Sequence, residues 1–173
     1  MMLRGFLFTL FVIFSQLGNS QEKYANHTYG FKIEFPDLYV DEVKEKEEMK
    51  VISISSSYQK MIFLASIFDY KKAVPADELN LKEIEALAVT AEAFNAKFKA
   101  KKIEKWQIGA YEGLSYPIKG KVTRNDKTMK FYGKMYVVAI KDGIEFRLTI
   151  LAPSKKSYHA DKALIYIKSA SIN

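Results

Sequence analysis

Side chains that commonly perform chemistry in proteins are scarce in this chain of 173 residues. It contains no cysteine, so it offers no thiol nucleophile, thiolate metal site or disulfide. Its two histidines are His27 and His159. His159 and Asp161 are two positions apart in a predicted helix and would point to different sides, and no histidine pair has the spacing of a helical zinc motif. The sequence therefore predicts no metal site and no cofactor.

Motifs for nucleophilic catalysis and phosphate binding are also missing. Gly113-Leu114-Ser115-Tyr116-Pro117 begins like a nucleophile elbow but lacks its closing glycine and lies in a strand pattern. We interpret Ser115 as structural. No glycine-rich phosphate or dinucleotide loop is present. We expect a protein that is not an enzyme, although acid–base carboxylates can be recognised only in three dimensions, so an enzyme stays a third alternative.

Four lysines form the most distinct charged cluster, and they lie at the end of a predicted helix: Lys97, Lys99, Lys101 and Lys102. They could form a contact surface for an anionic partner. Alternatively, they complement the carbonyl end of that helix. Aromatic residues do not alternate with them and no nucleic-acid motif is present, so we expect no nucleic acid as partner.

The first twenty residues have the features of a secretory signal peptide. Arg4 supplies a positive start, Phe6–Phe14 is apolar except for Thr9, and Gly18-Asn19-Ser20 offers small residues for cleavage between Ser20 and Gln21. An uncleaved anchor is the alternative, but the apolar stretch is shorter than the roughly 20 residues of a membrane span. Cleavage would leave 26 basic and 20 acidic residues, net +6, with no membrane span. We expect an exported protein, periplasmic or secreted.

Residues 21–173 are long enough for one domain with a single core. Period-two alternation predicts three consecutive antiparallel strands over Gly113–Leu151. It also predicts a half-buried strand at Tyr29–Phe35 and a hairpin formed by Val51–Ser57 and Lys60–Tyr70. The second arm of that hairpin is apolar on both faces, so we expect both faces of the sheet to be covered.

Two helices are predicted to provide this cover. Apolar residues at three- and four-residue steps indicate a helix over Leu81–Ala100 and a second over Ser154–Ser169. The expected inner side of the second helix consists of Tyr158, Leu164, Ile165 and Ile167. Gln21–Thr28 is expected to be a loose arm and Ala170–Asn173 a short tail. The single tryptophan, Trp106, is interpreted as part of the core or its cover.

The order of these elements and several short motifs resemble the Mog1/PsbP-like superfamily. The motifs are the opening Tyr29–Pro36, the Tyr-Glu-Gly-Leu entry into the meander at Tyr111–Leu114, the Leu-Ala-Pro strand end at Leu151–Pro153, and the Lys168-Ser169 pair. The resemblance covers nearly all of the chain after the signal segment. It implies an α+β fold with a central antiparallel sheet between helices, an α/β/α sandwich. It also implies a binding or scaffolding role, although the superfamily is functionally diverse.

Two functional hypotheses follow for this domain. The first is an exported, non-enzymatic accessory or scaffold domain that binds a protein or another envelope component. The alternative is a small-ligand binder with a pocket between the sheet and the long helix, lined by phenylalanine and methionine.

Overall fold

The computed structural model describes residues 21–72, 99–100, 103–124, 127–141, 143–158 and 161–173. In chain order, the strands of this part are β1 (Glu22–Asn26), β2 (Phe31–Phe35), β3 (Tyr39–Lys46), β4 (Met49–Tyr58), β5 (Met61–Tyr70), β6 (Lys99–Ala100), β7 (Glu104–Ile108), β8 (Tyr111–Arg124), β9 (Lys127–Lys141), β10 (Ile144–Ala152) and β11 (Ser171–Ile172). The helices are α2 (Lys155–Tyr158) and α3 (Asp161–Ser169). The predicted signal peptide lies outside the described residues.

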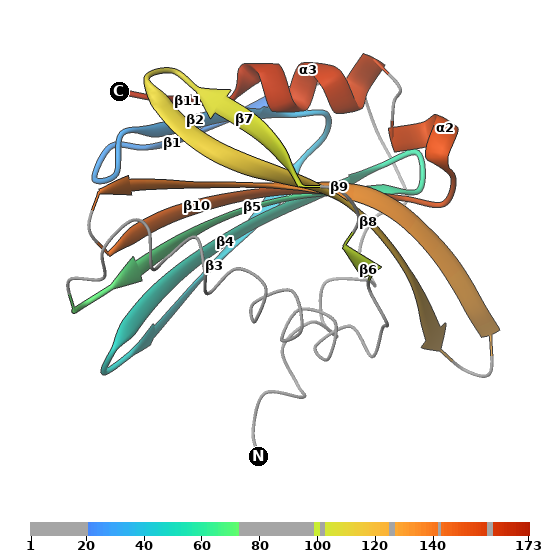
Figure 1. Cartoon of the computed structure of the whole chain (residues 1–173), viewed down its shortest axis with the longest axis horizontal. Helices are drawn as coiled ribbons and strands as arrows, with labels where there is room; N and C mark the ends of the chain where they lie inside the picture. Colours follow the sequence, from blue (N-terminus) through green and yellow to red (C-terminus); the bar gives the residue numbers. More distant parts are fainter. Residues whose placement is uncertain (1–20, 73–98, 101–102, 125–126, 142, 159–160) are drawn as a thin grey trace.

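The larger of two antiparallel sheets has eight strands in the order β3-β4-β5-β10-β9-β8-β6, with β7 also paired to β8 (Figure 1). Strands β8, β9 and β10 are neighbours in sequence and in space, which confirms the predicted meander. The predicted hairpin of β4 and β5 is confirmed too. β10 lies between β5 and β9, and every one of its residues is buried. β10 is therefore the buried central strand of the larger sheet.

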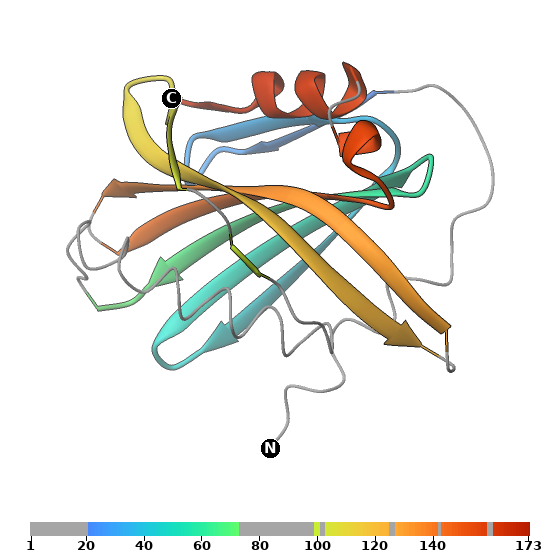
Figure 2. The same cartoon turned by 45° about the vertical axis from the view of Figure 1, so that its right-hand side comes forward.

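The smaller sheet has three strands in the order β1-β2-β11 and packs on one face of the larger sheet (Figure 2). β2 buries Phe31, Ile33 and Phe35 in the core between the sheets, as its alternating pattern predicts. The Phe31 ring stacks on that of Phe146 in β10, with centroids 4.4 Å apart. Aromatic contacts therefore join the layers.

Both predictions of irregular ends were wrong. The expected loose arm Gln21–Thr28 contains β1, and the expected tail Ala170–Asn173 contains β11, and these strands pair with opposite edges of β2. The Asn173 backbone N–H also donates to the Gly30 carbonyl at 3.0 Å. Polar composition indicated loops here, but β2 presents two edges whose backbone groups need partners.

The predicted C-terminal helix is present as α2 and α3. The Ser154 hydroxyl accepts the Ser157 N–H at 3.1 Å and so caps α2. α3 lies over the smaller sheet, and its inner side is wrongly predicted in part (Figure 1). Leu164 and Ile165 are exposed, whereas Ile167 packs against the core as expected.

The side of α3 that is fully buried carries Ala163 and Tyr166. The Tyr166 hydroxyl donates to the Leu64 carbonyl of β5 at 2.6 Å. At the helix end, the Ser169 hydroxyl accepts the Glu34 N–H at 2.9 Å and so fixes α3 to β2. Alanine is small and tyrosine is polar, so neither residue was expected on the inner side of the helix. The more hydrophobic Leu164 and Ile165 were expected there instead.

The predicted α/β/α sandwich is wrong. The described molecule is mostly β, and a three-stranded sheet lies where a helical layer was expected (Figure 1). The alternation in Tyr29–Phe35 specifies a half-buried strand, but it does not specify which sheet that strand joins. The predicted helix Leu81–Ala100 lies outside the described residues except for Lys99–Ala100, which form strand β6.

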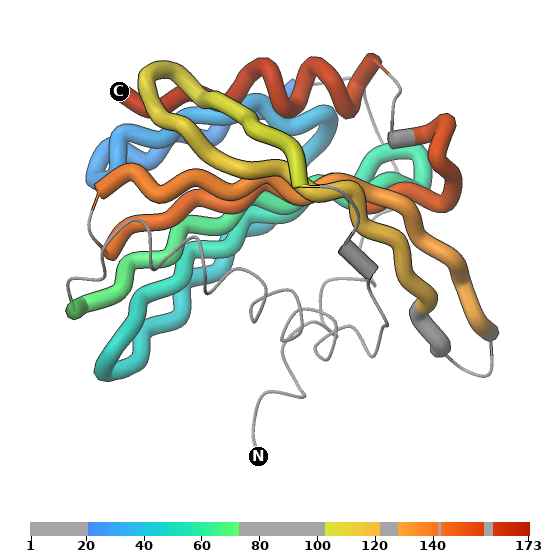
Figure 3. The backbone as a smooth tube through the Cα atoms, viewed as in Figure 1, coloured from blue at the N-terminus to red at the C-terminus, as the bar shows by residue number. Residues whose placement is uncertain are grey.

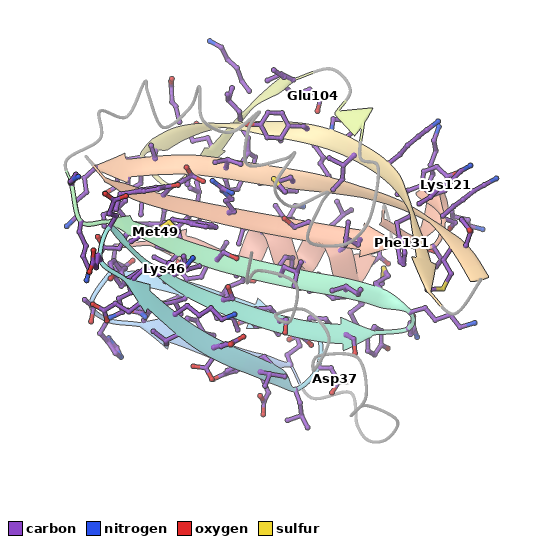
Figure 4. All side chains as sticks on the ribbon, turned by 90° about the horizontal axis from the view of Figure 1, so that it is seen from below. Asp37, Lys46, Met49, Glu104, Lys121 and Phe131 are labelled. Carbon is purple, nitrogen blue, oxygen red and sulfur yellow. The ribbon has the colours of Figure 1, made fainter. Side chains whose placement is uncertain are left out.

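The larger sheet has two faces with different chemistry. The core face, toward the smaller sheet, carries apolar residues, among them Ile52, Ile54, Phe63, Ala65, Ile67, Val138, Phe146, Leu148 and Ile150. The opposite face, seen in Figure 4, mixes polar and apolar residues, among them Ser55, Leu64, Tyr116, Met135, Val137, Glu145, Arg147 and Thr149. Trp106 belongs to the periphery of the core: it is half-buried, and its ring meets that of Tyr136 edge-on at 5.1 Å.

Candidate functional site

In the outer half of the β8–β9 hairpin, charged side chains lie on one face and apolar side chains on the other. Residues that pair directly across antiparallel strands share a face of the ribbon. The register pairs Lys121 with Lys130 and Lys119 with Tyr132, and all three lysines are exposed. We call Lys119, Lys121, Lys130 and Tyr132 the lysine face.

Apolar residues occupy the reverse side of this ribbon. Met129 lies opposite Val122 and is 43% exposed, and Phe131 lies opposite Gly120. Figure 3 shows the hairpin bending away from the rest of the larger sheet, and Figure 4 labels Lys121 and Phe131 near its end. The lysine face is therefore presented on a projecting arm.

Two like charges face one another in this arm, because Lys121 is directly opposite Lys130. Like charges at directly paired positions destabilise a sheet. No carboxylate forms an ion pair with Lys119, Lys121 or Lys130 within the described ranges. Residues 117–134 contain six basic residues and one acidic residue, net +5.

The hairpin of β3 and β4, at the other end of the sheet, has a different charge pattern (Figure 4). Its acidic side chains are interspersed with lysines, and two of them pair with lysines that follow β5. Lys71 Nζ lies 2.9 Å from Glu45 Oε1, and Lys72 Nζ lies 3.3 Å from Glu48 Oε1. The Lys71 ion pair lowers the pKa of Glu45. The acidic run is therefore a solvated hairpin end, and the unbalanced charge belongs to the β8–β9 arm.

A second unusual feature is a buried ion pair on the opposite face. Glu145 and Arg147 are two positions apart on β10, and the Arg147 Nε–H donates to Glu145 Oε1. The Arg147 guanidinium also lies 4.1 Å from the ring centre of Phe68. Burial raises the pKa of Glu145, and Arg147 opposes that rise. Burial, followed by the negative charge of Glu145, raises the pKa of Tyr70.

Three buried polar atoms on this same face lack a hydrogen-bond partner in the part of the chain that the structure describes. They are Ser55 Oγ, Tyr116 Oη and Glu145 Oε2. Each belongs to a residue that is at most 5% exposed. Buried polar groups without partners are rare in folded proteins because each one costs free energy.

Most of the candidate site residues named from the sequence do not belong to the lysine face or to the Glu145–Arg147 pair. Lys97, Lys101, Lys102, His159 and the cleavage residue Ser20 lie outside the described residues, and Gln21 is the first described residue. Lys99 is in β6, opposite Lys119, so the predicted cluster adjoins the lysine face through this one residue. His27 is exposed in the turn after β1, and Ser115 is buried within β8.

Neither the lysine face nor the buried Glu145–Arg147 pair was predicted from the sequence. Lys119, Lys121 and Lys130 were visible as charges, but their common face depends on the register between β8 and β9. Glu145 and Arg147 were visible as polar positions alternating with apolar ones, a pattern that normally indicates a solvated face. Their burial depends on what lies beside and over β10.

No three His, Asp or Glu side chains in the described ranges are grouped so that they could hold a metal ion. None of the helices found in these ranges has the length and apolar character needed to span a membrane.

Comparison with known proteins gives a likeness in structure only. No family model matches the chain, and no curated protein matches it. The solution structure of cyanobacterial PsbP (CyanoP) from Synechocystis sp. PCC 6803 is similar with a TM-score of 0.59 and 9% sequence identity, over 95% of this chain and 99% of that one.

Two more distant likenesses are also found. LpqN, involved in cell envelope biogenesis of Mycobacterium tuberculosis, gives a TM-score of 0.42 at 10% identity, over 89% of this chain and 91% of LpqN. A protein of unknown function from Pseudomonas aeruginosa gives 0.38 at 12% identity, over 86% of this chain and 94% of that one. The chain has the PsbP-like fold that its sequence motifs indicated.

Proposed function

We propose that this protein is an exported, non-enzymatic accessory domain that binds an acidic protein of the cell envelope through its lysine face. The observation that carries the proposal is the direct pairing of Lys121 with Lys130 on a projecting hairpin. This arrangement is unfavourable in the free protein and becomes favourable when an anionic surface lies over it. The signal-peptide pattern of residues 1–20 supports export.

The chemistry of the lysine face favours a protein over a lipid surface. Its fourth member is the half-buried Tyr132, and tyrosine is enriched at protein interfaces. Met129, an exposed apolar residue of the arm, points to the reverse side. The lysines therefore do not surround an apolar group that would insert into a membrane.

The test is affinity purification from an envelope extract of the host, with the tagged protein and two double variants. Lys121→Gln/Lys130→Gln removes two charges from the lysine face. Lys32→Gln/Lys105→Gln removes the same charge from two exposed lysines outside it. We expect a protein that is retained by the wild type and by the Lys32/Lys105 variant, released by salt, and lost by the Lys121/Lys130 variant.

Two outcomes would overturn this proposal. A partner that binds the Lys121/Lys130 variant as well as the wild type would place its contact elsewhere. Binding to phosphatidylglycerol vesicles that depends on Lys121 and Lys130, with no protein recovered, would assign the lysine face to the lipid surface.

A further inference from the structure

Lysine and tyrosine alternate along one face of β9, beginning in the lysine face. Positions two apart on a strand share a face. One such row consists of Lys130, Tyr132, Lys134 and Tyr136. Lys130 is exposed, and the other three are half-buried, so part of each side chain is accessible. The surface of the lysine face therefore continues along β9 toward the rest of the larger sheet.

A tryptophan lies at the inner end of this row. Trp106 of β7 is opposite Gly113 of β8, which in turn is opposite Val138 of β9. Because Gly113 has no side chain, the Trp106 ring reaches over β8 and meets the Tyr136 ring edge-on at 5.1 Å. Both rings pack against the core on one side and are half-buried. We call Trp106 and Tyr136 the aromatic patch.

Positive charge is distributed unequally along this surface. Lys134 lies between the lysine face and the aromatic patch, and its Nζ is 2.7 Å from Glu104 Oε2. The same ammonium group lies 5.4 Å from the centre of the Tyr136 ring. Lys134 is thus neutralised by a carboxylate, whereas none within the described ranges pairs with Lys121 or Lys130. The surface is cationic at its outer end and aromatic at its inner end.

We propose that the acidic partner binds along this surface through a segment with two parts: carboxylates over the lysine face and a large apolar side chain against the aromatic patch. This inference rests on the proposed function and adds the chemistry of a second contact. Tryptophan and tyrosine often contribute most of the binding energy of an interface. Complementary charges contribute orientation and the rate of association.

The geometry of β9 sets the length of that segment. A strand rises about 3.4 Å per residue, so Lys130 and Tyr136 are roughly 20 Å apart along β9. An extended segment therefore needs about four or five residues between its carboxylates and its apolar side chain.

A protein segment fits this surface better than a nucleic acid strand does. Lysines interleaved with aromatic rings also occur where single-stranded nucleic acid binds, but there a positively charged groove follows the phosphate backbone. Here the ion pair between Lys134 and Glu104 interrupts the positive charge between the lysine face and the aromatic patch.

Trp106 is the only tryptophan of the chain, so its fluorescence reports contact at the aromatic patch. The probes are two unlabelled peptides, Glu-Glu-Glu-Glu-Gly-Ser-Gly-Ser-Phe-Phe and the same sequence ending in Ala-Ala. Their affinities for the purified protein are measured by calorimetric titration. We expect the Phe peptide to bind about tenfold more tightly than the Ala peptide. Only the Phe peptide should produce a saturable change in the emission of Trp106.

Three variants separate the two contacts. Tyr136→Leu should lower the affinity for the Phe peptide to near that for the Ala peptide. Tyr39→Leu is the matched control and should keep the tenfold difference, because Tyr39 is also half-buried against the core but lies on β3. Both substitutions leave an apolar side chain over the core. Lys121→Gln/Lys130→Gln should weaken the binding of both peptides.

The outcomes that overturn the inference differ in what they say of the lysine face. Equal affinities for the two peptides, both dependent on Lys121 and Lys130, would remove the second contact but support the proposed function. Binding of neither peptide, or binding that the Lys121/Lys130 variant retains, would overturn the inference together with the anion-binding role on which it rests. Tighter binding of an oligothymidylate than of the Phe peptide would assign the surface to single-stranded nucleic acid.

Discussion

Glu145 and Arg147 form an ion pair within a single strand, with both side chains on one face of the sheet and almost no access to water. Glu145 is 1% exposed and Arg147 8% exposed. Positions two apart on a strand point the same way, so the spacing brings the groups together without any long-range constraint. The pair introduces two charges into the centre of the sheet, where desolvation opposes their ionised forms.

The first prediction concerns the stability contribution of this pair. Glu145→Leu should destabilise the fold by about 3–5 kcal/mol because it leaves the Arg147 charge buried and uncompensated. The double variant Glu145→Leu/Arg147→Met should recover most of that loss, because apolar pairs of similar volume often replace buried ion pairs without cost. Urea unfolding of the wild type, both single variants and the double variant measures the coupling. Additive effects in this cycle would contradict a direct interaction.

The second prediction uses adjacent serines on β4. Ser56→Ala should lower the free energy of unfolding by about 1 kcal/mol, because it removes the hydrogen bond to the Asp37 carbonyl. Ser55→Ala should leave stability unchanged or raise it, because the lost hydroxyl has no partner in the described part of the chain. Thermal unfolding of the two variants, with no ligand added, distinguishes them. A larger loss for Ser55→Ala would show that its hydroxyl has a partner in the protein.

The third prediction compares the stability effects of removing the hydroxyl from Tyr166 and from Tyr116. Tyr166→Phe removes the hydroxyl that bonds the Leu64 carbonyl and should destabilise the fold by about 1–2 kcal/mol. Tyr116→Phe should be neutral or stabilising, since it deletes a buried hydroxyl with no partner within the described ranges. Both changes keep the ring, so packing is the same in variant and wild type. Chemical unfolding would contradict this prediction if Tyr116→Phe lost as much as Tyr166→Phe.

Local pattern predicted much of this fold. The alternation within residues 113–151 specifies consecutive strands, and β8, β9 and β10 pair in that order. The strand at Tyr29–Phe35 was also correctly predicted and is β2. These features depend on a period of two, which can be read from contiguous residues.

The predictions that failed needed information from distant residues. Strand β11 has only two residues, Ser171 and Ile172, and forms because β2 offers an unpaired edge. Tyr166 is buried on α3 because its hydroxyl reaches a carbonyl of β5, more than 100 positions earlier in the chain. The lysine face similarly depends on the register that places Lys121 opposite Lys130. Pairing across the fold, not composition, decides each of these features.

The fourth prediction tests the electrostatic origin of the proposed docking surface. Lys121→Glu converts the like-charge pair with Lys130 into an attractive pair, so it should raise the free energy of unfolding by roughly 0.2–1 kcal/mol. The same change should abolish binding of an acidic partner. We expect Lys121→Glu to be more stable than the wild type and to have lost binding. Raising the salt concentration should reduce the increase in the free energy of unfolding. Lower stability of Lys121→Glu would argue that the lysine pair is not a source of repulsion.

The fifth prediction concerns alkaline pH and the bond between Tyr29 and Asp69. The Tyr29 hydroxyl donates to Asp69 Oδ2 at 2.6 Å, and burial together with this carboxylate raises the pKa of Tyr29 from 10.0 to about 12. Between these values the folded protein keeps a proton that the unfolded chain loses, so this contribution to stability is complete below pH 10 and declines as pH rises toward 12. Tyr29→Phe should therefore be less stable than the wild type at pH 8, by about 1 kcal/mol, and the difference should shrink by pH 11.5.

Urea unfolding of both proteins at pH 8, 10 and 11.5 measures this change. The other tyrosines with raised pKa values, Tyr24, Tyr70 and Tyr166, are present in both proteins, so their contributions cancel in the difference. Asp69→Asn is the matched control, because the amide can still accept the hydrogen bond but carries no charge. In that background the pKa of Tyr29 should rise less, and the alkaline loss should be smaller. A difference between wild type and Tyr29→Phe that stays constant from pH 8 to 11.5 would show that the hydroxyl does not keep its proton in the folded protein, and that this contact between the two sheets is weaker than its geometry indicates.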